Sequence, residues 1–400
     1  FLKKIILAIV IFQNIYSQGI DLSQNWNFNS EFALSEDLES AIATQIATLP
    51  NTLGFIVIYK GEIVSENYYN SDENNAINVW SVTKSYMSTL VGQAVDMGML
   101  NDPDSTASHF FPEYDISFLD TLTLHNLLSM SSGYIDQFIP TDPFTFFFDP
   151  LQWWSLNSTE TLLSMNYSAP GTFLYNNSAC HLNAHALYYG SEMTPSDFAD
   201  VYLFPYLGIN NPIWESGYLD INDGSAMLHL TLREMVKLGQ LYLQNGYSGN
   251  NQILSSEWID RATQSQVNTG EEEEYGALNY YGYLWWLPNE EGSIYSAQGL
   301  GGQIIAVFPE YETDLNSPAL VTCLAKRVYF AITIDNGVMH MIALAKTPMI
   351  SLFGPTDSEK FAPDYKNSII LDSKKIYKNN NVSLITAEDV LKAAEQHLNF

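Results

Sequence analysis

The sequence Ser81-Val82-Thr83-Lys84 places a hydroxyl and an amine three residues apart at the predicted start of a helix. A strand-like segment precedes Trp80. The apolar residues that follow recur at helical spacing and end at a glycine: Met87, Leu90, Val91, Ala94, Val95 and Gly98. Side chains three residues apart lie on one face of a helix. We therefore predict a helix over 81–97 with Ser81 and Lys84 side by side.

This pair of side chains predicts a nucleophilic serine. A serine hydroxyl is a weak nucleophile until a neighbouring group takes its proton. A free lysine has a pKa of about 10.4, and bringing it towards 7 needs about 4 kcal/mol from its surroundings. Burial at the start of a helix is one source of that free energy. The alternative is that Ser81 is a helix N-cap and Lys84 is solvated.

The first residues have the pattern of a secretory signal peptide, which we place at 1–18. Lys3 and Lys4 form a basic end, Ile5 to Phe12 an apolar run, and Tyr16-Ser17-Gln18 a cleavage zone. The run is too short to span a bilayer. We expect a periplasmic or secreted protein with no membrane contact after removal of the signal. An uncleaved anchor is the alternative.

Charge divides the remaining chain into two parts. Residues 19–325 carry 5 Lys/Arg and 37 Asp/Glu, a net charge of −32, whereas residues 326–400 carry 9 and 8, a net charge of +1. An acidic surface disfavours nucleic-acid and anionic-membrane partners. The abrupt change predicts a domain boundary at 325/326. With only Cys180 and Cys323 in the chain, we expect no structural disulfide.

The order of predicted elements indicates an α+β fold with a helical insertion. A helix over 35–49 and a hairpin over 54–69 precede the Ser81 helix. Further helices are expected at 122–130, 196–207 and 231–245, and strands at 281–287, 292–297 and 303–308. The two ends of this region would then complete one sheet.

Tyr175-Asn176-Asn177 follows a Pro170-Gly171 turn and precedes an apolar, helix-like stretch. A serine–lysine site needs a second proton-transfer group and a group that orients the substrate. Tyr175 and Asn177 offer both. The alternative is an ordinary turn. His181 and His185 lie four apart nearby, but no matching carboxylate cluster accompanies them, so we predict no metal site and no cofactor.

Together these motifs resemble the serine β-lactamase and penicillin-binding-protein superfamily, in the class C-like branch with esterases and 6-aminohexanoate-dimer hydrolases. The similarity covers about 35–312. The matching segments are Ser81-x-x-Lys84, 127–133, Tyr175-x-Asn177, 205–209, 239–243 and 295–303. The resemblance implies an antiparallel sheet flanked by helices with a large helical insertion.

The resemblance also implies a role for each residue. Ser81 would form an acyl-enzyme, Lys84 would accept its proton, and Tyr175 would relay protons to the leaving group. Asn177, Gln298 and Gly299 would bind substrate, and the backbone N–H groups of Ser81 and Leu300 would form the oxyanion hole.

One position departs from the family pattern. Ala297 stands where the family has a Lys or His that would meet a substrate carboxylate. We therefore expect an uncharged ester or small amide as substrate, with weak or no β-lactamase activity. A catalytically silent binding protein on the same fold is the alternative.

The tail, 326–400, has a different pattern. A strand over 328–334, a glycine turn, a helix to about Ala345 and a strand over 348–353 predict a parallel, Rossmann-like α/β fragment. Its segments 335–340, 352–356 and 360–363 resemble the nucleotide-sugar half of heptosyltransferase-type glycosyltransferases. This resemblance implies nucleotide-sugar-binding roles for Asp335, Gly337 and His340.

Only about 73 residues match that family, so we expect no transfer activity. We interpret the chain as two unrelated reading frames joined within 312–327. A divergent extension of one enzyme is the alternative, and a glycosyltransferase fragment ranks last as the function. The oligomeric state does not follow from the sequence.

Overall fold

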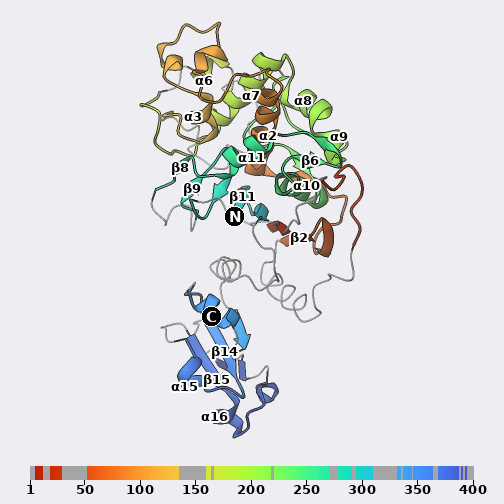
Figure 1. Ribbon diagram of the computed structural model, residues 1–400, viewed down its shortest axis with the longest axis vertical. Helices are drawn as coiled ribbons and strands as arrows, with labels where there is room; N and C mark the ends of the chain where they lie inside the picture. The colour runs from red at the N-terminus through yellow and green to blue at the C-terminus, as the bar shows by residue number, and fades with distance from the viewer. Residues whose placement is uncertain are drawn as a thin grey trace. The chain divides into compact units, whose positions relative to one another are not determined.

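The computed structural model forms two compact units, Phe1–Glu310 and Tyr311–Phe400 (Figure 1). It describes residues 5–11, 19–28, 52–134, 159–163, 166–217, 220–270, 278–290, 294–309, 331–334, 337–344, 346–363, 368–386, 389–390 and 392–393. The predicted helix over 35–49 and the boundary at 325/326 lie outside these residues. Both remain predictions.

The first unit is built on an eight-stranded sheet. Its order is β3-β2-β1-β12-β11-β10-β9-β8. Strands β2 (Thr52–Tyr59) and β3 (Glu62–Tyr68) form the predicted hairpin. Lys60 and Gly61 have φ values of 51° and 76°, as a tight hairpin turn requires. The hairpin prediction is confirmed.

Strand β1 (Ile5–Ile11) lies between the hairpin and β12 (Gln303–Phe308), parallel to both neighbours. The other strand pairs described in this sheet are antiparallel. The predicted signal peptide therefore supplies a strand to the middle of the sheet. Removing residues 1–18 would leave β2 and β12 without that partner.

The predicted strand over 281–287 is instead a short hairpin. Strands β9 (Tyr280–Tyr281) and β10 (Trp286–Leu287) pair antiparallel around a turn in which Leu284 has a φ of 62°. The alternation of apolar residues did not reveal the turn, because both halves of a hairpin are equally apolar. The sheet continues on either side with β11 (Tyr295–Gln298) and β8 (Val267–Asn268).

The Ser81 helix is the central helix of this unit. It comprises a 3₁₀ turn, η1 (Trp80–Val82), followed by α2 (Thr83–Asp96), in which every residue from Thr83 to Ala94 is buried. A helix buried on all sides must satisfy its polar side chains internally. Thus Ser85 donates to the Leu284 carbonyl and Gln93 donates to the Tyr202 carbonyl.

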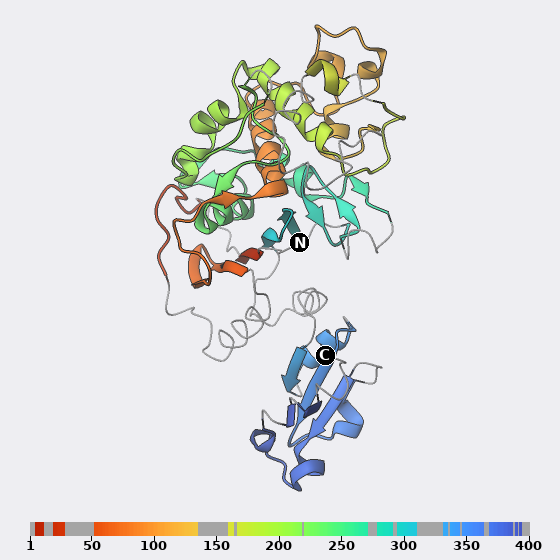
Figure 2. The ribbon, with the colours of Figure 1, turned by 180° about the vertical axis from the view of Figure 1, so that it is seen from behind.

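Other helices enclose α2. Figures 1 and 2 show α7 running beside it in both views. The other α-helices that the structure describes in this unit are α3 (Leu124–Leu128), α6 (Thr159–Leu163), α7 (Asn177–Ser191), α8 (Pro195–Tyr202), α9 (Phe204–Leu207), α10 (Leu232–Leu243) and α11 (Ser256–Thr263). Helix α10 packs against β1, β2 and β12. One continuous apolar core joins the sheet to the helices.

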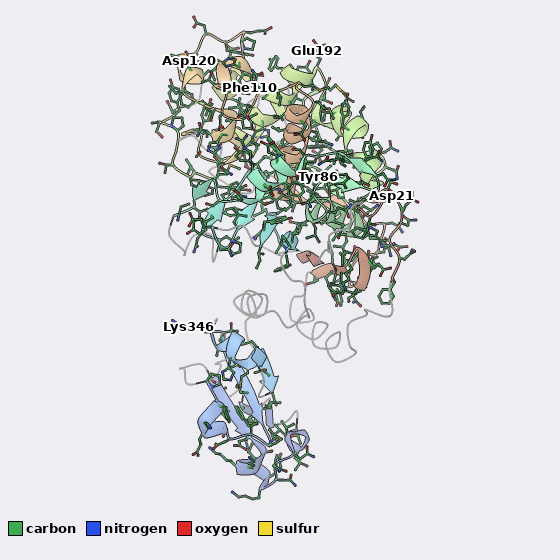
Figure 3. The ribbon with its side chains drawn as sticks, viewed as in Figure 1. Asp21, Tyr86, Phe110, Asp120, Glu192 and Lys346 are labelled. Carbon is green, nitrogen blue, oxygen red and sulfur yellow. The ribbon has the colours of Figure 1, made fainter. Side chains whose placement is uncertain are left out.

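The acidic side chains labelled in Figure 3 lie at the outside of this unit. Asp21, Asp120 and Glu192 are exposed at its edge, whereas Tyr86 is buried within it. Within the described part of the chain, no helix is both long enough and apolar enough to cross a membrane.

The second unit contains a three-stranded parallel sheet, β13-β14-β15. Its elements are β13 (Ala331–Ile334), α14 (Gly337–Leu344), β14 (Met349–Phe353), α15 (Ser358–Phe361), β15 (Ser368–Asp372) and α16 (Ser373–Tyr377). The predicted β–turn–α–β order is confirmed. Gly337 begins α14 and His340 is exposed on it. Asp335 lies outside the described residues.

Candidate active site

A strained turn places Ser81 at the start of α2. Strand β4 (Ile77–Asn78) ends two residues before Trp80, which has a φ of 49°. The Trp80 N–H donates to Asn78 Oδ1 at 2.8 Å, and the Val79 N–H donates to the Leu228 carbonyl at 2.8 Å. A non-glycine residue in this region costs about 1–3 kcal/mol. These bonds hold the turn, so Ser81 is half-buried rather than solvated.

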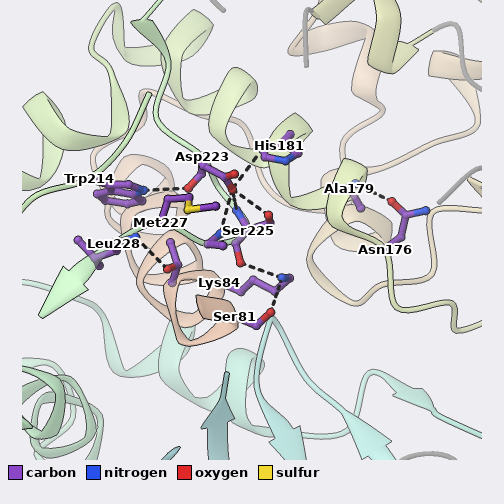
Figure 4. Close-up of polar contacts among 12 residues, drawn as sticks. Ser81, Lys84, Asn176, Ala179, His181, Trp214, Asp223, Ser225, Met227 and Leu228 are labelled. Carbon is purple, nitrogen blue, oxygen red and sulfur yellow. Dashed lines mark hydrogen bonds and ion pairs between the residues drawn. The ribbon is translucent and has the colours of Figure 1, made fainter. Parts of the chain in front are cut away.

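Lys84 contacts Ser81 directly. Its Nζ donates to Ser81 Oγ at 2.8 Å and to the Ser225 carbonyl at 2.8 Å (Figure 4). The Lys84 residue is only 1% exposed. The solvated-lysine alternative is therefore wrong, because the packing of α2 encloses the whole side chain.

No ion pair to Lys84 is found among the described residues, within 4.0 Å between nitrogen and carboxylate oxygen. A carboxylate in that position would hold the ammonium proton. Here the groups around Nζ are a hydroxyl, a carbonyl and an aromatic ring. Only the Ser81 hydroxyl among these readily exchanges a proton with the amine.

Tyr175 places the face of its ring over the amine. Lys84 Nζ lies 5.0 Å from the ring centroid, a cation–π distance. The Tyr175 ring also stacks on Trp286 of β10, with ring centroids 5.3 Å apart and an interplanar angle of 21°. The structure thus brings Tyr175 to the Ser81–Lys84 pair from a segment about 90 residues further along the chain.

The 127–133 motif anchors the segment that carries Tyr175. The Leu174 N–H donates to the Met130 carbonyl at 2.8 Å, and the Gly171 N–H donates to the Ser131 carbonyl at 2.8 Å. Gly133 has a φ of 80°. A Cβ there would lie 2.3 Å from the Ser168 carbonyl oxygen. The motif therefore positions Tyr175 through backbone contacts.

The two asparagines after Tyr175 have different places. Asn176 is the buried N-cap of α7, and its side chain accepts from the Ala179 N–H at 3.2 Å. Asn177, predicted to bind substrate, is the first residue of α7 and is half-buried. The sequence could not assign the cap, because either asparagine has the side chain that a cap requires.

Strand β11 brings the 297–300 segment next to the Ser81 turn. A Cβ at Gly299 would lie 2.4 Å from the Val79 carbonyl oxygen, so this close approach requires glycine. Ala297 is buried in the core, and Gln298 donates to Ser296 Oγ at 2.9 Å. Leu300 is 56% exposed. Gly299 thus lies directly against the backbone that leads into the Ser81 turn.

Sequence reasoning missed the loop 223–226, which supplies the carbonyl that accepts from Lys84. It lies more than 130 residues from Lys84 and has no motif of its own. Asp223 is buried in this loop, and its Oδ1 lies 3.7 Å from His181 Nδ1 on α7. Burial lowers the pKa of His181, Asp223 raises it and Lys84 lowers it, with a net lowering that favours the neutral ring.

A thiol, Cys180, and an imidazole, His185, also lie on α7. Burial raises the pKa of the free Cys180 thiol to about 12, so it stays protonated and unreactive. His185 Nδ1 forms a hydrogen bond with Thr159 Oγ1. Among the described residues, no group of three His, Cys, Asp or Glu side chains is placed to hold a metal ion.

A serine–lysine pair at a helix start, beside a sheet strand and a tyrosine, defines the serine-hydrolase class of site. The family model described as "Beta-lactamase" matches residues 46–334. The chain belongs to the beta-lactamase family, as the resemblance predicted. A model of glycosyltransferase family 9 (heptosyltransferase) matches 296–390, so the tail is similar to that family.

Individual relatives agree with this family. "Beta-lactamase-like protein 2" of Dictyostelium discoideum is 30% identical over 122 residues, which cover 27% of this chain and 21% of the relative. The match thus spans about a fifth of that protein's length. Its activity does not transfer directly to this chain.

Solved structures show the same fold. A candidate beta-lactamase from Bacteroides dorei has a TM-score of 0.59 at 20% identity, covering 69% of this chain and 88% of that one. A candidate 6-aminohexanoate-dimer hydrolase from Bacillus anthracis has a TM-score of 0.56 at 19% identity, covering 73% and 81%. The predicted α+β, β-lactamase-like fold is confirmed.

Proposed function

We propose that this protein is a serine hydrolase that cleaves an uncharged ester or small amide through an acyl-enzyme. The observation that carries the proposal is the 2.8 Å hydrogen bond between a fully buried Lys84 amine and Ser81 Oγ. No carboxylate among the described residues competes for the amine, so the pair can exchange the serine proton.

The proposed acylation step conserves atoms and charge. Ser81 Oγ bonds to the substrate carbonyl carbon while its proton passes to the Lys84 amine, a step that requires the unprotonated form of this amine. Two backbone N–H groups, from Ser81 and Leu300, would stabilise the oxyanion. When the carbon–oxygen or carbon–nitrogen bond breaks, the leaving group takes the proton, with the Tyr175 hydroxyl as the relay. Water then cleaves the acyl-enzyme by the reverse path.

Two features support an uncharged substrate. Ala297 is buried in the apolar core, so position 297 has no positive charge that could pair with a substrate carboxylate. The surface of this unit is strongly acidic. An anionic substrate would therefore be repelled at long range and would lack a partner at the site. The aromatic pair Tyr175 and Trp286 beside Lys84 offers an apolar surface instead.

A substrate panel on the full chain tests the proposal. We expect p-nitrophenyl esters of short acids to be hydrolysed with a kcat/KM at least about 100-fold above that for nitrocefin. Ser81→Ala should abolish ester turnover. Equal turnover of nitrocefin would contradict the substrate class. Undiminished ester turnover in the Ser81→Ala variant would contradict the proposed mechanism.

The silent binding protein remains the alternative function. It predicts that the parent chain turns over no ester or amide in this panel and forms no adduct with a fluorophosphonate probe. Export to the periplasm or medium is also a proposal, supported only by the pattern of residues 1–18.

A further inference from the structure

The Ser225 carbonyl that accepts from Lys84 belongs to a loop held by one carboxylate. Asp223 Oδ1 accepts from the Ser225 N–H at 2.7 Å, from Ser225 Oγ at 2.8 Å and from the Ala226 N–H at 2.9 Å (Figure 4). Asp223 is buried, as is Ser225. Three donors on one oxygen fix the orientation of the peptide that bears the Ser225 carbonyl.

The same loop is fixed to its surroundings at both sides. The Trp214 indole N–H donates to the Asp223 carbonyl at 2.8 Å, which holds the backbone before the turn. A Cβ at Gly224 would lie 2.3 Å from the Cys180 carbonyl oxygen, so the loop packs directly on the backbone of α7. His181, one turn further along α7 than Asn177, also approaches Asp223.

Asp223 thus connects the two segments that surround Lys84. One segment is the loop whose Ser225 carbonyl accepts a hydrogen bond from Lys84. The other is the start of α7, which follows Tyr175 directly. The Lys84 amine has two hydrogen-bond acceptors among the described residues, Ser81 Oγ and the Ser225 carbonyl, 2.8 Å from each. A shift of the second acceptor would move the amine relative to the first.

We propose that Asp223 is a positioning residue for Lys84, which acts by orienting the Ser225 carbonyl so that the amine stays directed at Ser81 Oγ. This inference rests on the proposed function, because it assigns Asp223 to the same reaction. Asp223 would contact neither substrate nor the reacting atoms. Its effect should therefore appear in the rate of acylation and not in substrate affinity.

The competing explanation is that Asp223 only stabilises the loop. Asn222 provides a control, because it is buried directly before this loop and its side chain makes two hydrogen bonds of its own. Its side chain accepts from the Ser196 N–H at 2.8 Å and donates to the Trp214 carbonyl at 2.8 Å. Neither bond involves residues 225 or 226. If Asp223 only stabilises the loop, Asn222→Ala and Asp223→Ala should lower kcat equally.

The test is the kinetics of full-length variants with a p-nitrophenyl ester. Asp223→Ala should lower kcat at least about tenfold while KM stays within about twofold, because three donors lose their acceptor. Asp223→Asn keeps one acceptor oxygen and should recover most of the loss. Asn222→Ala should stay within about twofold of the parent. Parental kcat in Asp223→Ala, an equal loss in Asn222→Ala, or a change confined to KM would overturn the proposal.

A second measurement needs no enzyme activity, so it separates this inference from the proposed function. Reductive methylation of Lys84 is followed by mass spectrometry, with the buried Lys237 as internal reference. We expect Lys84 in Asp223→Ala to react at least about tenfold faster than in the parent, because its amine loses a fixed acceptor. An unchanged ratio would overturn the positioning role. Absent ester turnover in the parent would contradict only the proposed function.

Discussion

The two units of this chain differ in how much apolar core supports their buried polar groups. In the first unit, one continuous core encloses Lys84, Asp223 and His181. Among the described residues of the second unit, the buried apolar side chains include two small clusters, one of Met339, Ile342, Met349 and Phe353 and the other of Ile350 and Ala393. Lys84 is buried in this core without a carboxylate partner among the described residues, although burying a charged group unpaired is costly.

The two units also differ in what a buried aspartate does: Asp372 in the second unit and Asp223 in the first bind different parts of the backbone. Asp372 accepts from Ser358 Oγ at 2.6 Å and from the Lys374 N–H at 2.8 Å, and it caps α16. Asp223 makes a similar set of bonds, but the carbonyl that it orients faces the lysine of the candidate site. The second unit therefore uses its buried carboxylate to cap the N-terminus of a helix, whereas the carboxylate of the first unit lies beside the candidate site.

The largest expected effect is a loss of ester turnover when Lys84 is replaced, compared with replacement of a second buried lysine of the first unit, Lys237. Lys84→Met keeps an apolar side chain of similar length but removes the amine, so ester turnover should fall about 10⁴-fold. Lys237→Met on α10 should leave turnover within about twofold, because no described bond joins Lys237 to Ser81. Steady-state kinetics at pH 8 checks both. A similar loss in both variants would show that burial of a lysine, and not its contact with Ser81, is what matters.

The next effect should be confined to the second unit. Phe353→Ala removes a fully buried ring from its larger cluster and should destabilise that unit by about 4 kcal/mol. Amide hydrogen exchange over 349–372 should then become rapid while ester turnover stays unchanged. A parallel loss of turnover would mean that the two units depend on each other.

A proline in β1 tests whether the N-terminal segment belongs to the folded first unit. Ile9 pairs with Val57 on one side and Ala306 on the other. Ile9→Pro removes a ladder donor and should lower the free energy of unfolding by about 3 kcal/mol. Mass spectrometry must first show whether residues 1–18 are retained. The variant chain could instead be found to begin after residue 18 and to melt at the Tm of the parent protein. That result would contradict the placement of β1 in the sheet and would support the signal peptide.

The smallest effect concerns an ion pair between β3 and α10. Arg233 donates to both carboxylate oxygens of Glu66, at 2.6 and 2.7 Å. Burial raises the pKa of Glu66, but the hydrogen bonds from Arg233 and Tyr68 outweigh it and hold the pKa below its ordinary value of 4.5. The stabilisation is therefore complete above pH 4.5 and is lost as pH falls further.

Glu66→Gln should accordingly cost about 1–2 kcal/mol at pH 7. The difference in Tm from the parent should shrink as the pH is lowered through 4.5. Asp120→Asn, at the exposed edge of the same unit, should leave Tm unchanged at both pH values. A pH-independent difference for Glu66→Gln would indicate lost packing and not a lost charge.

Local patterns in the sequence predicted elements in both units, among them the helix that carries Ser81 and Lys84. The hairpin over 54–69, the Ser81 helix and the β–turn–α–β order of the tail depend on residues near one another in the chain. The sequence did not reveal the turn at Leu284, the strand β1 or the Asp223 loop. The turn at Leu284 was hidden because both halves of its hairpin are equally apolar. Strand β1 and the Asp223 loop depend on contacts between segments far apart in the chain, and an aspartate before a glycine looks like any other turn.

The most direct test of the account is the site of covalent labelling by a fluorophosphonate probe, read by peptide mass spectrometry of the full chain. The account predicts one adduct, on Ser81, formed at least about 100-fold more slowly in Lys84→Met and absent from Ser81→Ala. An adduct on another residue, or labelling of Ser81 at the parental rate without the Lys84 amine, would contradict it.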